Sequence, residues 1–469
     1  MEFFNVVDGQ RRASDSHHQC INPRSEEPLW DAPVATVHDL EDAITAAQKT
    51  LQTWSKTTVK ERADYLRRVV DVYTAHKEEL MDIIMKETGK SSLMAEIEIG
   101  NTCEQTIYYT KVHLEDEVTF EDEKLKIVAT HHPLGIFGAI CPWNFPLILS
   151  NIKVVSSLIT GNCVIVKPSP CAPYSVMKSV ELLIDVLPPG VVQVVNGGTD
   201  LGVAMTLHPA IAKISFTGTI ATGKSIMANC AKTLKRLTLE LAGNDAAIVT
   251  DDIDVAKVAG QVATGCFFNA GQVCVAAKRV YVHESVYDNF LEKFASEVKK
   301  SYSINNDARS PSLFGPVSNK TQYDAVRDIA RHYSKHGSNI IAAELPSDSK
   351  GFWIPPTIVT KPPEESILVQ EEQFGPIVPM LTWTDEEDVL RRANLRNAGL
   401  GASVYCRDIG RAESIARRLE AGTVAINVPE LPHPGGYFAG MKDSGHGGEM
   451  GKQGLSSYCY TKCLQFPKD

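Results

Sequence analysis

The sequence predicts an α/β protein with two domains built around parallel sheets. Short runs rich in β-branched residues, Cys163–Val166, Val191–Val195 and Ile214–Phe216, have the character of buried parallel strands. Helical patterns lie between them, at Ser175–Leu187 and at Leu201–Leu207. Strands that alternate with helices in this way are typical of a doubly wound sheet, so we expect one such domain in the middle of the chain.

A second alternation follows and predicts a second α/β domain. Its expected strands are Asp245–Val249 and Arg279–Val282, and its expected helices are Val255–Asn269 and Ser285–Lys300. The junction between the two domains is predicted near Glu240–Gly243. A cleft between domains is a common place for a ligand or active site, so we look for the chemistry there.

The N-terminal part of the chain is mainly helical in its pattern. Val59–Thr88 carries apolar residues at helical spacing, among them Leu66 and Val69, and Gly89 follows as a plausible C-terminal stop. We predict one long helix here, and we expect its apolar residues to pack against the domain rather than to take part in chemistry.

Composition excludes several classes of protein. The chain has 469 residues, 43% hydrophobic and 22% charged, which is ordinary globular composition with material for two or three domains. The formal net charge is -10 and no dense basic run occurs, which argues against a nucleic-acid partner. The most apolar stretch, 147–159, is interrupted by Asn151, Lys153 and Ser156, so we predict no membrane span.

The cysteines and the N-terminus indicate a cytoplasmic protein. The chain begins with an early acid, Glu2, and without a basic and apolar signal block. Eleven cysteines in a long chain of this kind predict reduced thiols rather than a disulfide framework. Cys459 and Cys463 do not complete a four-ligand zinc pattern with nearby Cys or His, so we predict no metal site.

Two side chains near the domain junction have the chemistry of a nucleophile and a base. Cys274 follows Gly271-Gln272, and Glu240 lies in the apolar run Leu237–Asn244. Alone, a cysteine is most often a small buried hydrophobe, and an acid between leucines is a buried, satisfied group. Here Gly271 permits close backbone approach to a thiol that must attack as the thiolate. Burial would raise the pKa of Glu240 towards the value that suits a general base at neutral pH.

Asn144 is a candidate oxyanion donor. It lies in Cys141–Pro146, where two prolines restrict the backbone, and an amide held there can donate a hydrogen bond to a developing negative charge. An Asn flanked by prolines is, on general grounds, more often only a turn former.

Two segments that follow predicted strands have the character of a ligand crevice. Lys167-Pro168-Ser169 comes directly after the strand Val164–Val166, and the carboxyl ends of parallel strands face the ligand in such sheets. A solvated lysine at a strand end is the simpler interpretation. Phe216–Gly223 combines glycines and hydroxyls at the start of a helix, which can cradle a phosphate, although it is not a GxGxxG motif.

Six segments now occur in one order along the chain: Pro142-Trp143-Asn144, Lys167-Pro168-Ser169, Phe216-Thr217-Gly218, Glu240-Leu241-Ala242-Gly243, Gly271-Gln272-Val273-Cys274 and Glu371-Glu372-Gln373-Phe374-Gly375-Pro376. Together they resemble the aldehyde dehydrogenase superfamily over essentially the whole chain. The resemblance is to the NAD(P)-dependent members that release a carboxylic acid by hydrolysis.

The resemblance implies a role for each candidate. Cys274 would attack an aldehyde to give a thiohemiacetal, whose oxyanion Asn144 and the Cys274 amide would hold. Hydride transfer to the nicotinamide would leave a thioester, and Glu240 would activate the water that hydrolyses it. Lys153, on the helix after Asn144, would support the site. The residues implied in cofactor binding are Trp143, Lys167, Ser169, Pro170, Gly198, Gly202, Phe216, Gly218, Thr219, Leu241, Glu372 and Phe374.

The resemblance also implies a three-part architecture. A Rossmann-like dinucleotide-binding domain would comprise 1–113 and 132–240, an α/β catalytic domain 241–445, and a small β oligomerisation arm 114–131 with 446–469. Within the arm, Leu114–His131 and Ser456–Phe466 would pair, and the alternation of Val118 and Phe120 is compatible with a hairpin. Such an arm implies a homodimer or a homotetramer.

Two departures from the family pattern affect cofactor and substrate. Many NAD-preferring relatives carry an acid three residues after the lysine, and here that position is Pro170. Its loss removes one repulsion against the 2′-phosphate of NADP, but no Arg or Lys stands beside Ser169, so NAD is favoured and NADP is left open. The loop Val428–Tyr437 lacks Arg and Lys, which predicts no clamp for a carboxylate-bearing aldehyde, and Leu149 and Ile152 predict an apolar tunnel.

Two other functions remain open at this stage. A CoA-acylating relative would transfer the acyl group to a thiol, but such relatives tend to lack the acid at the position of Glu240. A non-catalytic protein on the same fold is the second alternative, and the number of filled site positions argues against it.

Overall fold

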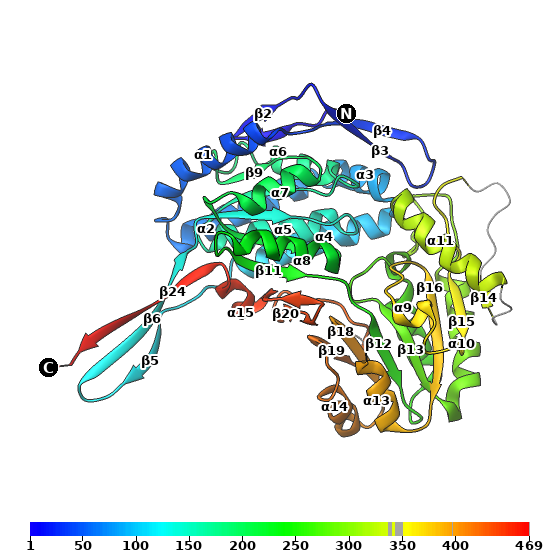
Figure 1. Ribbon diagram of the computed structural model, residues 1–469. Helices are drawn as coiled ribbons and strands as arrows, with labels where there is room; N and C mark the ends of the chain where they lie inside the picture. Colours follow the sequence, from blue (N-terminus) through cyan, green and yellow to red (C-terminus); the bar gives the residue numbers. More distant parts are fainter. Residues whose placement is uncertain (336–339, 343–349, 396, 469) are drawn as a thin grey trace.

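The computed structural model describes residues 1–335, 340–342, 350–395 and 397–468. Within them, two large sheets are each covered by helices, and a β arm projects from one side (Figure 1). The predicted α/β class with parallel sheets is confirmed. Within the described residues, no helix is both long enough and apolar enough to cross a membrane.

The first sheet is the doubly wound one predicted from the middle of the chain. Its strands lie in the order β2 (Gln10–Arg12), β1 (Asn5–Val7), β9 (Val192–Val194), β8 (Cys163–Lys167), β7 (Ile136–Ile140), β10 (Ile211–Thr217), β11 (Arg236–Glu240) and β22 (Gly445–His446). The five strands from β9 to β11 are parallel, whereas β1, β2 and β22 run antiparallel to their neighbours. All five residues of β7 and of β8 are buried, as expected for strands covered on both faces.

Helices cover both faces of this sheet. The crossovers α5 (Pro146–Ile159) and α6 (Tyr174–Glu181) are followed by α7 (Thr199–Leu207) and α8 (Ile220–Ala231) after the strand order reverses at β7. The remaining N-terminal helices are α1 (Val37–Trp54), α2 (Val59–Ala75), α3 (Lys77–Thr88) and α4 (Ser92–Tyr109), and α4 packs along α5. The side chains of these elements form one large core.

The predicted nucleophile, Cys274, lies just before β13 (Ala277–His283), the central strand of the second sheet. Its strands lie in the order β14 (Ile340–Ala342), β15 (Thr357–Thr360), β16 (Ile377–Trp383), β13 (Ala277–His283), β12 (Asp245–Val249), β18 (Gly401–Tyr405) and β19 (Thr423–Ile426). All are parallel to their neighbours except β14. The associated helices are α9 (Val255–Phe267), α10 (Tyr287–Ser301), α11 (Lys320–Lys335), α12 (Ile367–Gln370), α13 (Glu386–Asn394) and α14 (Ile409–Ala416), and two separate apolar clusters line the two faces.

Small antiparallel elements complete the fold. The arm pairs β6 (Leu125–Pro133) with both β5 (Glu117–Glu121) and β24 (Cys459–Pro467), so its two outer strands come from distant parts of the chain. The other elements are the hairpin β3 (His17–Ile21) with β4 (Pro28–Pro33), the pairs β17 (Ala398–Gly399) with β21 (Met441–Lys442) and β20 (Phe438–Ala439) with β23 (Gly448–Glu449), and helix α15 (Gly451–Ser456). The predicted domain boundaries stay a prediction.

The long helix predicted for Val59–Thr88 is wrong, because the chain forms two helices that meet at His76. The backbone of His76 leaves the helical region, at φ -104° and ψ 19°. Its ring contacts the carboxylate of Glu79 at 3.1 Å, in the first turn of α3. Acidic side chains at this position favour a new helix N-terminus, a signal that the apolar spacing hides.

Three other helix predictions had wrong ends. The helix predicted for Ser175–Leu187 ends at Glu181 and continues in tight turns that reach Pro188. The helix predicted to reach Asn269 ends at Phe267, because the chain then turns into the left-handed region to approach Cys274. The helix predicted for Ser285–Lys300 begins at Tyr287, after a 3₁₀ turn over Glu284–Val286, and runs to Ser301.

Gly89 and Gly100 provide a matched pair that tests the end of α3. Gly89 has φ +76°, and an added Cβ would lie 2.5 Å from Pro316 Cγ, whereas Gly100 lies inside α4 with nothing within 4 Å. We expect Gly89→Ala to lower the free energy of unfolding by at least about 1–2 kcal/mol, because an L-residue is strained there. We expect Gly100→Ala to raise it by about 0.5–1 kcal/mol. Urea unfolding of both variants measures the difference, and equal effects would contradict this account.

Candidate active site

The thiol of Cys274 and the carboxylate of Glu240 are in direct contact. Cys274 Sγ donates to Glu240 Oε1 at 3.2 Å. Glu240 is the last residue of β11 in the first sheet, and Cys274 precedes β13 in the second sheet. The structure therefore brings the predicted nucleophile and the predicted base together where the two sheets meet.

Three consecutive residues before Cys274 lie in the left-handed region. Asn269, Ala270 and Gly271 have φ values of 52°, 54° and 71°. An added Cβ on Gly271 would lie 2.5 Å from Gly375 O, so glycine is required there by space as well as by φ. The conformation is costly for Ala270, which is fully buried.

Gln272 secures this strained turn. Its side-chain amide donates to Asn269 O at 3.0 Å and to Pro316 O at 3.2 Å, and its Oε1 accepts from Ser318 N at 2.8 Å. The first bond closes the turn itself, and the other two tie it to the segment that precedes α11. Both residues of the Gly-Gln pair in the motif, Gly271 and Gln272, therefore help to shape the turn before Cys274.

Burial dominates the protonation of both reactive groups. Desolvation raises the pKa of the Cys274 thiol well above its usual value, the charge of Glu240 raises it further, and Lys278 opposes both. Desolvation also raises the pKa of Glu240, against the nearby Lys153 ammonium, while Glu449 adds to the rise. The raised pKa of Glu240 makes its carboxylate a stronger base and a suitable acceptor for the thiol proton.

Lys153 connects this pair to a second carboxylate, Glu449, which the sequence analysis missed. The Lys153 ammonium, fully buried on α5, donates to Glu449 Oε1 at 2.8 Å and to Thr217 Oγ1 at 3.1 Å. Thr217 in turn donates to Glu240 Oε2 at 3.3 Å, and Ser215 donates to Glu449. A lysine in an otherwise apolar helix signals a buried acid, but the sequence alone does not say which one.

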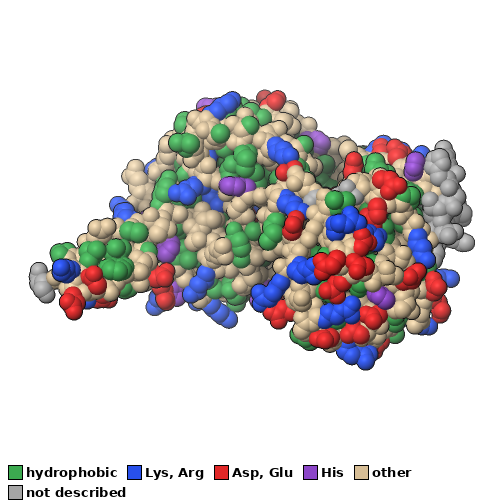
Figure 2. Space-filling view, turned by 60° about the horizontal axis from the view of Figure 1, so that its bottom comes forward, with side chains coloured by type: hydrophobic (Ala, Val, Ile, Leu, Met, Phe, Trp, Pro, Cys, Tyr) green, Lys and Arg blue, Asp and Glu red, His purple; other side chains and the backbone are tan. Residues whose placement is uncertain are grey.

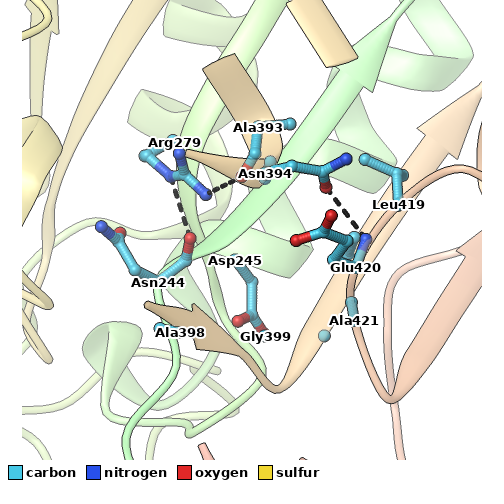
Figure 3. A pocket seen from close by; sticks show the side chains of 13 residues that line it. Asn244, Asp245, Arg279, Ala393, Asn394, Ala398, Gly399, Leu419, Glu420 and Ala421 are labelled. Carbon is cyan, nitrogen blue, oxygen red and sulfur yellow. Dashed lines mark hydrogen bonds between the residues drawn. The ribbon is translucent and has the colours of Figure 1, made fainter. Parts of the chain in front are cut away.

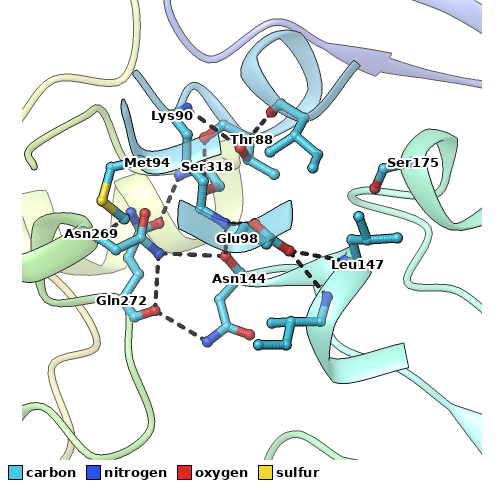
Figure 4. A network of polar contacts seen from close by, with 12 residues as sticks. Thr88, Lys90, Met94, Glu98, Asn144, Leu147, Ser175, Asn269, Gln272 and Ser318 are labelled. Atoms are coloured by element: carbon cyan, nitrogen blue, oxygen red, sulfur yellow. Dashed lines mark hydrogen bonds and ion pairs between the residues drawn. The ribbon is translucent and has the colours of Figure 1, made fainter. Parts of the chain in front are cut away.

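Asn144 faces the nucleophile loop from the other side (Figure 4). Its side chain is buried and donates from Nδ2 to Gln272 O at 3.1 Å, two residues before Cys274. The backbone carbonyl oxygen of Asn144 accepts from the Lys90 ammonium at 2.6 Å and from Asn269 Nδ2 at 3.4 Å. The predicted oxyanion donor therefore lies beside the predicted nucleophile.

A buried ion pair contacts the backbone of Asn144. Lys90 pairs with Glu98 at 2.5 Å, and both side chains are at most 1% exposed. Glu98 also accepts from the backbone N–H groups of Leu147 at 2.9 Å and Ile148 at 3.4 Å, at the start of α5 (Figure 4). A carboxylate at a helix N-terminus satisfies donors that would otherwise lack partners. The same pair thus orients Asn144 and the helix that carries Lys153.

The predicted cofactor residues at the first sheet gather at the carboxyl ends of its strands. Lys167 ends β8, is buried, and approaches Gly202 on α7, where an added Cβ would lie 3.6 Å from Lys167 Cε. Burial lowers the pKa of Lys167 to about 8. Gly198 precedes α7, and Thr219 caps α8 by accepting from Thr222 N at 3.3 Å.

Other residues of this group pack or turn in ways that the sequence did not show. Phe216 closes over Gly218, where an added Cβ would lie 2.4 Å from Phe216 Cζ, and Leu241 packs against Gly223. Ser169 Oγ accepts from Cys171 N at 3.2 Å. The carbonyl oxygen of Pro170 lies 2.8 Å from His18 Nε2 and accepts from Cys20 Sγ at 3.2 Å, so the N-terminal hairpin covers this position.

The remaining predicted cofactor residues lie on the nucleophile side. The rings of Trp143 and Phe374 meet edge to face with centroids 5.4 Å apart. Glu372 forms an ion pair with Lys278 at 3.1 Å and accepts from Gly243 N at 3.3 Å. The structure thus separates the predicted cofactor residues into two groups, one at the strand ends of the first sheet and one beside Cys274.

Comparison with known proteins gives the family of this chain. The model of the aldehyde dehydrogenase family matches residues 10–464. A putative aldehyde dehydrogenase, FUS7, of Gibberella fujikuroi is 40% identical over 460 residues, 98% of each chain, and the aldehyde dehydrogenase LUC3 of a Fusarium species is 38% identical over 99% of each chain. A chloroplastic betaine aldehyde dehydrogenase of Beta vulgaris is 31% identical over 97% of this chain and 94% of its own.

Solved structures agree with this result. An aldehyde dehydrogenase from Bacillus cereus superposes with a TM-score of 0.95 at 29% identity, over all of this chain and 97% of its own. A betaine aldehyde dehydrogenase from Staphylococcus aureus, solved with NAD⁺, superposes with a TM-score of 0.93 at 29% identity, over 99% and 95% of the two chains. The chain belongs to the aldehyde dehydrogenase family and is an NAD(P)-dependent enzyme that oxidises aldehydes.

Replacement of Glu449 tests its electrostatic role. Glu449→Gln removes a negative charge that raises the pKa of Glu240 and leaves the Lys153 ammonium free to act on Glu240. The pKa of Glu240 should therefore fall, and the acid limb of the kcat–pH profile should move to lower pH by about one unit. Glu449→Asp, which keeps the charge, should hold the midpoint near that of the unaltered enzyme. An upward shift in Glu449→Gln would contradict the assignment.

Proposed function

We propose that this enzyme oxidises an aldehyde to the carboxylic acid with NAD(P)⁺ and water through a covalent intermediate on Cys274. The observation that carries the proposal is the 3.2 Å contact between Cys274 Sγ and Glu240 Oε1, in a setting that also holds Asn144. A nucleophile, a base within hydrogen-bond reach and an amide donor beside them are the parts that acyl chemistry on a thiol requires.

The first step uses the contact as it stands. Glu240 takes the thiol proton, and the thiolate attacks the aldehyde carbon to give a thiohemiacetal, whose oxygen carries the negative charge. Asn144 Nδ2 and the Cys274 backbone N–H then donate to that oxygen. Loss of one such donor costs about 10²–10³ in turnover, because charge develops where the donor points. Asn144 would exchange its bond to Gln272 O for this one.

The residues present fit a dinucleotide. Among the residues that the structure describes, the buried Lys167 ammonium makes one hydrogen bond, 3.4 Å to Pro168 O, which leaves donors for ribose hydroxyls. The start of α8 offers backbone N–H groups to phosphate, and Glu372 offers a carboxylate to the second ribose. We assign Ser169, Pro170, Gly198, Gly202, Phe216, Gly218, Thr219 and Leu241 to the same region, and Trp143 and Phe374 to the nicotinamide end. When bound, NAD(P)⁺ would supply the hydride acceptor that brings the carbon held on Cys274 to the oxidation level of a thioester.

Hydrolysis completes the cycle. Glu240, which by then has lost its proton to solvent, activates a water that attacks the thioester, and the thiolate leaves. General-base catalysis of this kind contributes about 10²–10⁴ in rate. The presence of Glu240 favours release of a free acid over acyl transfer to coenzyme A. Product analysis in the presence of coenzyme A separates the two: only acyl-CoA would point to the alternative.

The substrate is proposed to be an aldehyde without a carboxylate. Ile152 is fully buried in an apolar cluster that contacts Val273 and Cys274, together with Phe438 and Met450. The loop 428–437 carries no Arg or Lys. A preference for succinate semialdehyde over neutral aldehydes would contradict this proposal. For the cofactor we propose NAD, with NADP use left open by Pro170.

Assembly and location are proposed on separate grounds. The arm exposes Val118, Phe120, Tyr460, Leu464 and Phe466, and Figure 2 shows hydrophobic side chains along it. An exposed apolar strip on a projecting sheet favours pairing between subunits, so we propose a homodimer or homotetramer, which light scattering distinguishes from a monomer. Eleven unpaired cysteines support a reducing, cytoplasmic location.

Two variants separate the two halves of the proposed mechanism. Cys274→Ala should abolish formation of reduced cofactor from any aldehyde, because no thiohemiacetal forms. Glu240→Gln should slow hydrolysis of the thioester by about 10²–10⁴-fold, so that at most one reduced cofactor per site appears before turnover stalls. A stopped-flow trace with NAD⁺ and NADP⁺ in parallel measures both. Full activity in Cys274→Ala would overturn the proposed function.

A further inference from the structure

Lys278 contacts the backbone of Cys274, and none of the roles assigned so far includes it. It is on β13, four residues after Cys274, and its side chain is only 3% exposed. Its ammonium donates to Cys274 O at 2.6 Å, to Val273 O at 3.1 Å and to Ala276 O at 3.2 Å. The buried Lys278 ammonium therefore binds three carbonyl oxygens of the turn that carries the Cys274 thiol.

The same ammonium also reaches the proposed cofactor carboxylate. Lys278 Nζ lies 3.1 Å from Glu372 Oε1, and that oxygen accepts from Gly243 N at 3.3 Å. Gly243 is three residues after Glu240, on the segment that joins the two sheets. Lys278 thus contacts the stretch that carries Cys274 and the Glu372 carboxylate, and Glu372 in turn contacts the stretch that follows Glu240.

The neighbouring Arg279 serves a different purpose. Its guanidinium donates to the carbonyl oxygens of Asn244 at 2.9 Å and Ala393 at 3.0 Å, on the wall of a small cavity that Asp245 also lines (Figure 3). Arg279 therefore secures the start of β12, whereas Lys278 is the cation that contacts the Cys274 carbonyl.

Lys278 is surrounded by acidic side chains, and burial raises the pKa of each of them. The titratable groups that face it are Glu372, Asp245, Glu430 and the Cys274 thiol, with Glu240 beyond the thiol. Burial alone would lower the pKa of Lys278, but the charges of Glu372 and Asp245 outweigh it and raise the pKa, so the ammonium stays charged at neutral pH. For the Cys274 thiol, Lys278 acts in the opposite direction to burial and Glu240.

We propose that Lys278 is a positioning residue for this reaction. Its ammonium fixes the Cys274 loop and the Glu372 carboxylate relative to each other, and its positive charge stabilises the Cys274 thiolate. The inference rests on the proposed function, because it takes Cys274 as the nucleophile and Glu372 as a cofactor ligand. Lys278 would then support both groups and so couple the reactivity of the Cys274 thiol to the binding of the nicotinamide ribose.

The test uses two measurements on the full-length enzyme that require no turnover. Lys278→Met keeps the length of the side chain and removes its charge. Alkylation of Cys274 by iodoacetamide, followed by mass spectrometry of its peptide between pH 6.5 and 9.5, should slow about tenfold, because the thiol pKa rises by about one unit. The dissociation constant of NADH, from its fluorescence without aldehyde, should increase about fivefold as Glu372 loses its partner.

Three further variants separate electrostatic support from simple damage to the fold. Lys278→Arg keeps the charge and should restore most of the alkylation rate. Glu372→Gln removes a negative charge near Lys278 and should speed alkylation, opposite in sign to Lys278→Met. Lys257→Met, an exposed lysine on α9, should leave the alkylation rate and the NADH dissociation constant unchanged. Should Lys278→Met fail to fold, the opposite shift in Glu372→Gln still decides the matter.

An unchanged alkylation rate and unchanged NADH affinity in folded Lys278→Met would overturn the inference, as would slower alkylation in Glu372→Gln. A lower unfolding temperature with neither change would mean that Lys278 only stabilises the fold. These outcomes are distinct from failure of the proposed function, which Cys274→Ala reports independently through loss of reduced-cofactor formation.

Discussion

The arrangement of this site depends on the burial of a thiol and a carboxylate in mutual contact. Desolvation disfavours the charged form of both Cys274 and Glu240, so neither ionises easily without help from nearby cations. Lys153 supplies a positive charge on the Glu240 side, and Lys278 does so on the Cys274 side. Each lysine is itself buried and pairs with another carboxylate, Glu449 in one case and Glu372 in the other.

Together with Lys90–Glu98, these make three pairs of a buried lysine with a carboxylate around the site, and among the three carboxylates Glu372 is partly exposed. A buried ion pair contributes little net stability, because desolvation offsets the attraction, but loss of one partner is expensive. In this site the ion pairs fix the positions of neighbouring groups. Lys90 holds the carbonyl of Asn144, Lys278 holds the carbonyl of Cys274, and Glu98 caps the helix that delivers Lys153. Catalytic groups held by such contacts need little reorganisation when charge develops.

The sequence was informative wherever chemistry depends on residue type within a short segment. Glu240, Asn144 and Cys274 were predicted from their motifs, and the structure places Glu240 in contact with Cys274 and Asn144 in contact with the loop that carries Cys274. Glu449 and Lys278 were not identified, because each stands far in the sequence from some of its partners or carries no distinctive motif. The break at His76 and the left-handed turn at Ala270 were missed for a related reason: apolar spacing predicts that a helix exists, not where tertiary contacts end it.

The sequence by itself determined the α/β class and the family, and it predicted a nucleophile, a base and an oxyanion donor, since these follow from local patterning and from residue chemistry. Only the tertiary structure decided which buried charges neutralise one another. The pairs Lys153–Glu449 and Lys278–Glu372 span 296 and 94 positions, respectively, and join elements that are distant along the chain. A charge buried in low dielectric must find a partner in space, and the distance along the chain carries no information about which partner that is.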